Sequence, residues 1–124
     1  MQILLFARDG VGDHIREAVT RAVPETEVIN TMGNLASKLR HPFVRPVVVI
    51  LIAASSSDFV DIQQMKWLLQ EFCTILILPD RNKETITAGR CFQPRFMGCM
   101  NDDGDEIAVA LCKMLTRERE VAPS

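Results

Sequence analysis

Three short polar stretches contain the side chains with which this chain could bind an anion or activate a nucleophile. They are Arg8–His14 (RDGVGDH), the serine triplet Ser55–Ser57 and the polar loop Asp80–Asn82. Each follows a run of aliphatic residues that predicts a strand. In an open parallel sheet, ligands bind beyond the carboxyl ends of the strands. The loops expected at that edge are therefore the candidate ligand-binding loops, represented by Arg8, Asp9, Ser55 and Asp80.

The stretch Arg8–His14 lies between a predicted strand and a predicted helix, where free backbone N–H groups can hold a phosphate. It lacks the third glycine of a dinucleotide-binding fingerprint and the Lys-Ser/Thr pair of a P-loop. Asp9 and Asp13 would also repel an anion. The favoured interpretation is a turn followed by a helix that Asp13 caps.

The serine triplet could bind a phosphate or supply a nucleophile. No histidine lies near it in the sequence, and it does not form the G-x-S-x-G motif of a nucleophile elbow. A loop that leads into a helix, capped by Ser57 or Asp58, is favoured over catalysis. Asp9 and Asp80 could be the remnant of a polar crevice, but solvated acids at strand ends are the simpler explanation.

Neither cysteine nor histidine is arranged in a metal-binding pattern. The chain has four cysteines and no CxxC pair, and its two histidines lie on different predicted elements. Small apolar thiols in a reduced cytosol explain the cysteines better than a disulfide or metal framework. We therefore predict no catalytic residue, no metal and no cofactor.

Composition indicates one globular domain. The chain has 124 residues, of which 48% are hydrophobic and 24% charged, with a net charge of −2. This balance gives no electrostatic reason to expect a nucleic acid or an anionic membrane as partner. The N-terminal apolar run is interrupted by the charge of Arg8, so the run is too short for a signal peptide. No segment is long enough to span a membrane. The predicted location is the cytoplasm.

The chemistry-bearing loops are separated by an alternation of strands and helices centred on Pro46–Ala54 (PVVVILIAA). An unbroken run of Val, Ile and Leu is typical of a strand buried on both faces. The predicted strands are Ile3–Ala7, Glu27–Thr31, Pro46–Ala54, Thr74–Leu78 and Arg95–Met100. The helices after them are expected to start at Asp13, Asn34, Ser57 or Asp58, Asn82, and Asp102 or Asp103, the third running to Phe72. Their inward stripes are Ile15, Ala18, Val19 and Ala22; Leu35 and Leu39; Ile62, Met65, Leu69 and Phe72; Ile86; and Ile107, Leu111, Met114 and Leu115.

Such alternation predicts an α/β protein with a three-layer parallel sheet. In length and spacing it resembles the receiver domain of two-component response regulators, over nearly the whole chain. The resemblance implies a doubly wound, flavodoxin-like fold with a five-stranded parallel sheet in the order 2-1-3-4-5. Residues 1–117 would form this domain, and 118–124 would be a charged tail or the start of a linker.

Receivers accept a phosphoryl group on an aspartate at the end of the third strand. Two acids after the first strand hold Mg²⁺, a Ser or Thr ends the fourth strand and a Lys ends the fifth; together these groups neutralise the transferred charge. The matching positions here read Phe6-Ala7-Arg8-Asp9, Ile52-Ala53-Ala54, Leu78-Pro79-Asp80 and Gly98-Cys99-Met100. The nucleophile is missing and most of its partners are missing, so the resemblance implies a degenerate receiver that is not phosphorylated in the usual way.

Two function hypotheses follow. The first is a non-enzymatic signalling module that contacts a protein partner or a second copy through the face of the fourth helix, fifth strand and fifth helix. By resemblance, that surface would contain Ile86, Arg90, Phe92 and Arg95. The second is a small-molecule or nucleotide-binding domain that uses the loops at the carboxyl edge. Trp67, which lies off the main stripe of its helix, is either packed at the core edge or an exposed interface anchor.

Overall fold

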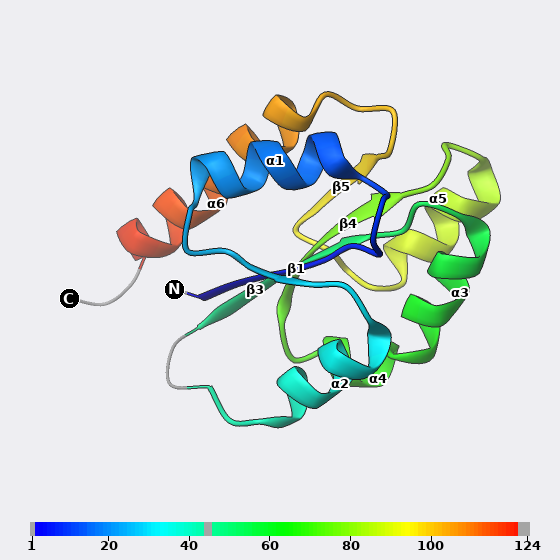
Figure 1. Cartoon of the computed structure of the whole chain (residues 1–124), viewed down its shortest axis with the longest axis horizontal. Helices are drawn as coiled ribbons and strands as arrows, with labels where there is room; N and C mark the ends of the chain where they lie inside the picture. The colour runs from blue at the N-terminus through cyan, green and yellow to red at the C-terminus, as the bar shows by residue number, and fades with distance from the viewer. Residues whose placement is uncertain (1, 44–45, 122–124) are drawn as a thin grey trace.

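The computed structural model describes residues 2–43 and 46–121 and shows strands and helices in alternation (Figure 1). The strands are β1 (Gln2–Phe6), β2 (Glu27–Ile29), β3 (Val47–Ile52), β4 (Cys73–Leu78) and β5 (Phe96–Cys99). The helices are α1 (Asp13–Ala22), α2 (Met32–Arg40), α3 (Ser56–Gln64), α4 (Lys66–Leu69), α5 (Lys83–Arg90) and α6 (Gly104–Val121). Among these described residues, no helix has the length and apolar character needed to cross a membrane.

The five strands form one parallel sheet in the order β2-β1-β3-β4-β5. The central strand, β3, is buried along its whole length, and Ile50 pairs with Leu5 on one side and Ile75 on the other. A fully buried strand needs apolar side chains on both faces, which is why its sequence is continuously aliphatic. The predicted α/β class and sheet order are confirmed, and the fold is flavodoxin-like.

Side chains from the two faces of the sheet form two cores. Val49 and Leu51 of β3 pack with α2, α3, α4 and the end of α5 on one face, through residues that include Leu35, Phe59, Ile62 and Leu69. Val48 and Ile50 pack with α1 and α6 on the other face, through Ile15, Val19, Ile107 and Leu111. The alternation of adjacent β3 residues between the cores follows from the two-residue period of a strand. The result is a three-layer arrangement (Figure 1).

The predicted helix from Ser57 or Asp58 to Phe72 is wrong in one respect, because the structure divides it into α3 and α4. Met65, at the division, has φ −99° and ψ 9°, and its N–H donates to the carbonyl of Ile62. The change of direction there still leaves Ile62 and Leu69 in the same core. The apolar stripe is therefore continuous across a break in the helix.

The predicted start of α1 at Asp13 is confirmed, but the predicted cap there is wrong. Gly12, not Asp13, is the N-cap residue of α1; its φ is 66°, and a Cβ there would lie 3.0 Å from Cγ2 of Ile52. A side chain at that position would be strained, so only glycine fits well. Asp13 lies inside the first turn, where its carboxylate accepts a hydrogen bond from Arg16.

Side chains also cap α2, α3 and α6. The side chain of Thr31 caps α2, which therefore starts at Met32 and not at Asn34. Ser55 caps α3: its Oγ accepts a 3.2 Å hydrogen bond from the N–H of Asp58, so neither Ser57 nor Asp58 is the cap. Asp103 is confirmed before α6, because its Oδ1 accepts from the N–H of Asp105.

The predicted inward stripes are largely confirmed. Ala22 is an exception, since it is exposed while the next residue, Val23, is buried. At the C-terminus, α6 continues through residues 118–121, which had been assigned to a tail, and residues 122–124 lie outside the described part.

Candidate functional site

Arg8 is the centre of a charged cluster at the carboxyl edge of the sheet. It follows β1, and its guanidinium reaches across the end of β3 to the first turns of α3. Its Nε lies 2.6 Å from Oδ1 of Asp58, and its Nη2 donates a 2.6 Å hydrogen bond to Oδ2 of Asp61. The side chain of Asp58 is only 9% exposed, whereas that of Arg8 is 46% exposed. One guanidinium therefore neutralises two carboxylates, one of which is largely removed from water.

The N-terminus of α3 adds to the stability of this cluster. Ser55 caps the helix through the N–H of Asp58, which fixes the backbone from which the Asp58 carboxylate projects. Acidic side chains in a first turn also interact favourably with the helix dipole. Asp58 is thus held by its backbone and by Arg8 together.

A second charged cluster, between Arg81 and Asp102, lies farther along the same edge. The loops after β4 and β5 bring the Arg81 guanidinium into an ion pair with Asp102. The other oxygen of Asp102 accepts a 2.8 Å hydrogen bond from the N–H of Cys99. A side-chain hydrogen bond with Cys99 and the negative charge of Asp102 raise the pKa of Arg81 above its ordinary value. The charge of Arg81 is therefore matched locally by the carboxylate of Asp102.

The structure places the predicted ligand-edge residues in separate local interactions. Asp9 accepts a 3.0 Å hydrogen bond from Asn30, which follows β2. Asp80 accepts from the N–H of Asn82, two residues further along its own loop. The strand β3 lies between β1 and β4, and each of the two acids is hydrogen-bonded close to its own strand. Ser55 is a helix cap, so of the four predicted residues only Arg8 lies in a multi-residue charged cluster.

Sequence reasoning missed the partners Asp61, Arg81 and Asp102 and assigned Asp58 only to capping. A signal for these pairs is present once the sheet order is known. An arginine follows β1 and acids follow the neighbouring β3; an arginine follows β4 and an acid follows the neighbouring β5. Opposite charges after adjacent strands are expected to meet at the shared edge.

Two hollows lie beside these clusters. One, of about 440 Å³, borders Arg8, Thr31, Gly33, Asp61 and Gln64. The other, of about 140 Å³, borders Asp80, Arg81, Ile86, Gly98 and Asp102. The polar groups that face them include Arg8 and Asp61, which pair with each other, and Thr31, which caps α2. A ligand would therefore compete with interactions that the protein already makes.

The predicted partner surface is only partly exposed. Arg90 and Arg95 are exposed and Ile86 is half-buried. Phe92 is 8% exposed and packs in the core, with its ring centroid 6.2 Å from that of Phe59. The chain turns inward after α5 to reach β5, and this turn places Phe92 beneath the surface.

Gly89 has a packing role in α5. A Cβ at Gly89 would lie 2.8 Å from Sδ of Met97 and 3.1 Å from Cδ2 of Leu78. The glycine therefore permits close contact between α5 and the sheet. Trp67, by contrast, is 64% exposed on α4, which excludes it from the core edge.

Among the residues whose side chains the structure describes, 2–43 and 46–116, no three His, Cys, Asp or Glu side chains come together as a metal site. His14 is engaged with the backbone, its Nε2 lying 3.1 Å from the carbonyl oxygen of Met100.

Comparison of the chain with protein-family models, with curated proteins and with solved structures finds no match.

Proposed function

We propose that this domain is a non-catalytic signal-transduction module: a receiver-like domain that acts by protein–protein contact and is not phosphorylated on an aspartate. The observation that carries the proposal is the carboxyl end of β3. Ala53 and Ala54 stand there, and Ala53 is fully buried. A methyl side chain cannot act as the nucleophile in phosphoryl transfer.

The charges at this edge support the proposal. Phosphorylation of a carboxylate needs a divalent cation to neutralise the phosphoryl oxygens, and Mg²⁺ needs free carboxylate ligands. Here the nearby carboxylates of Asp58 and Asp61 are bound to Arg8. A metal ion would have to displace this guanidinium, which carries the same sign of charge.

The contact surface in this proposal is the face of α5, β5 and α6, with Arg90 and Arg95 exposed and Ile86 half-buried. Ile86 and the exposed Arg90 lie one turn apart on α5, which suits a partner with a carboxylate beside an apolar side chain. The module would act in the cytoplasm as part of a two-component-like pathway.

Intact-mass spectrometry after incubation with Mg²⁺ and a small acyl phosphate tests the absence of phosphorylation. We expect no mass increase, while a phosphorylatable receiver domain treated in parallel gains one phosphoryl group. Incorporation that depends on Mg²⁺ and is lost in Asp58→Asn or Asp61→Asn would overturn the proposal, because it would make one of these carboxylates a phosphoacceptor.

The hollow of about 440 Å³ favours a second candidate function, the binding of a small molecule or nucleotide. A thermal-shift panel of nucleotides and flavins tests it, since a ligand of the folded state raises Tm with concentration. Gln64→Leu changes the wall of the hollow, and Gln63→Leu is its exposed neighbour outside it. A rise in Tm that Gln64→Leu abolishes and Gln63→Leu retains would establish this function; no rise favours the interaction module.

A further inference from the structure

We propose that two copies of this chain associate through α1 and α6 around a two-fold axis that passes at Val109. This interface is distinct from the α5 surface, and the inference does not depend on the absence of phosphorylation. It is carried by a hollow between two helices, an exposed apolar side chain and a self-complementary arrangement of charge.

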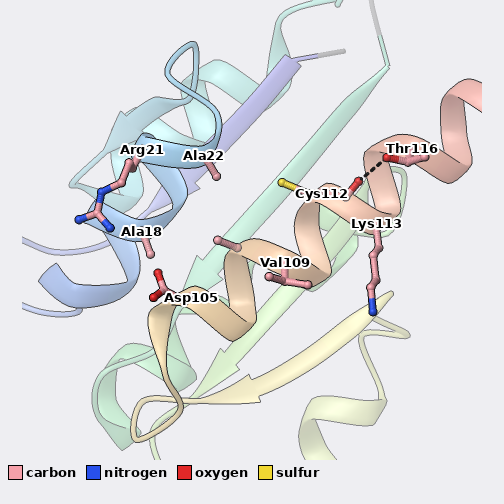
Figure 2. Close-up of a pocket in the computed structure, with 9 residues that line it drawn as sticks. Ala18, Arg21, Ala22, Asp105, Val109, Cys112, Lys113 and Thr116 are labelled. Carbon is pink, nitrogen blue, oxygen red and sulfur yellow. Dashed lines mark hydrogen bonds between the residues drawn. The ribbon is translucent and has the colours of Figure 1, made fainter.

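The hollow lies between α1 and α6 and has a volume of about 720 Å³ (Figure 2). Ala18 and Ala22 project from α1, and Ala108, Val109 and Cys112 from α6. These side chains are small, so a second helix can come close to both backbones. Arg21, Asp105, Lys113 and Thr116 complete the lining with polar groups. An apolar centre with a charged rim is the usual anatomy of a protein interface.

Val109 is an apolar side chain on α6 that is 53% exposed. Its exposure costs little by itself, but it adjoins the alanines that line the hollow. A partner that covers Val109 and these alanines removes their apolar surface from water, which favours association. The remaining question is which partner the surrounding charges select.

The charges select a second copy of the chain. Asp105 and Lys113 are both exposed and lie four residues before and four residues after Val109. Four residues span about 6 Å of an α-helix. A two-fold axis that passes beside Val109, lies in the plane of the interface and is perpendicular to the helix axis brings a second, antiparallel α6 against the first and exchanges positions at equal distances on either side. Asp105 of one subunit therefore faces Lys113 of the partner subunit, and the pair occurs twice.

Other orientations of the same helices are unfavourable. If two α6 helices packed in parallel about a two-fold axis along their length, identical residues would meet at the same height. Asp105 would then oppose its own copy, and Lys113 would oppose its own copy, which is destabilising for both pairs. The charge pattern thus specifies the antiparallel arrangement as well as the partner.

Cysteine cross-linking tests the position of the axis. In a background where the exposed thiols are removed by Cys91→Ser and Cys112→Ser, Val109→Cys places two thiols at the axis. We expect rapid formation of a disulfide-linked dimer under mild oxidation. Val60→Cys is the matched control, because Val60 is 50% exposed on α3, at the opposite face of the sheet. Equal cross-linking rates for the two variants would overturn the proposal.

Charge reversal tests the pairing. Analytical ultracentrifugation of the unmodified chain should show a concentration-dependent dimer, and Lys113→Asp should raise its Kd by about tenfold or more. The double variant Asp105→Lys with Lys113→Asp exchanges the two charges and should restore the dimer. Circular dichroism verifies that each variant is folded. A monomer at every soluble concentration contradicts the proposal, as does a dimer that survives Lys113→Asp but is lost in Arg90→Glu.

Discussion

The Arg8 side chain shows how one residue type changes the chemistry available at a sheet edge. Two acids at this place would attract a divalent cation, whereas an arginine supplies a fixed cation that needs no metal. Its contacts with Asp58 and Asp61 join the end of β1 to the start of α3. Arg8 is therefore expected to contribute to stability and not to catalysis.

Replacement of Arg8 by Met tests this role, since Met keeps the apolar stem and removes the charge. Asp58, with its side chain 9% exposed, would lose its cation. We expect a loss of about 1–2 kcal/mol in the free energy of unfolding, between the values typical of exposed and buried ion pairs. Urea denaturation measures this loss.

Arg16→Met is the matched control, because Arg16 pairs with Asp13, whose side chain is 54% exposed. The loss there should be about 0.5 kcal/mol or less. An equal effect of the two substitutions would show that the Arg8 cluster is no stronger than an ordinary surface ion pair.

At the scale of elements, the contact between α1 and α6 depends on Gly104. A Cβ at this position would lie 2.5 Å from the carbonyl oxygen of His14 and 3.1 Å from Cβ of Ala18. The first turn of α6 therefore packs directly against the backbone of α1 (Figure 1). This close approach places Ala108, Val109 and Cys112 of α6 beside the alanines of α1.

Gly104→Ala should destabilise the protein by about 1–3 kcal/mol, because backbone atoms must move to accept the methyl group. The midpoint of urea unfolding measures the effect. Gly33→Ala provides the comparison. Gly33 lies in α2, and a Cβ added there would meet nothing within 4 Å. The stability of that variant should be unchanged or higher by up to about 1 kcal/mol, because alanine has a higher helix propensity than glycine. A harmless Gly104→Ala would refute the close contact.

At the scale of the whole molecule, the strands were predictable from their aliphatic runs, whereas the sheet order came from the resemblance to receiver domains and the pairing of side chains was not predicted. Runs such as Val47–Ile52 are long and aliphatic, so they identify buried strands without knowledge of the fold. The three consecutive serines at the start of α3 each suit a helix cap, and only the folded chain distinguishes Ser55 from Ser57. The Arg8–Asp58 pair joins residues from separate elements and depends on both the sheet order and that helix start. The spacing of the apolar residues gives no sign of the break at Met65, because it continues unchanged across it.

Trp67 provides a whole-molecule prediction because it is the one tryptophan of the chain and is 64% exposed. Its emission should resemble that of free tryptophan in water. The α4 helix packs on the opposite face of the sheet from α1 and α6, so dimerisation through α6 should leave this emission unchanged. Fluorescence spectra recorded across the dimerisation range of concentrations provide the measurement. A blue shift with increasing concentration would instead place the self-contact at α4.

The measurement that tests the central claim most directly is a two-dimensional amide NMR titration of the domain with Mg²⁺ and a small acyl phosphate. It reports on phosphorylation, metal binding and ligand binding at once, residue by residue. The paired charges and the alanines after β3 predict that the amide signals of Arg8, Ala53, Ala54 and Arg81 stay in place throughout the titration. Concentration-dependent movement of these signals would contradict the account, because it would show that this edge of the sheet binds or reacts with the ligand.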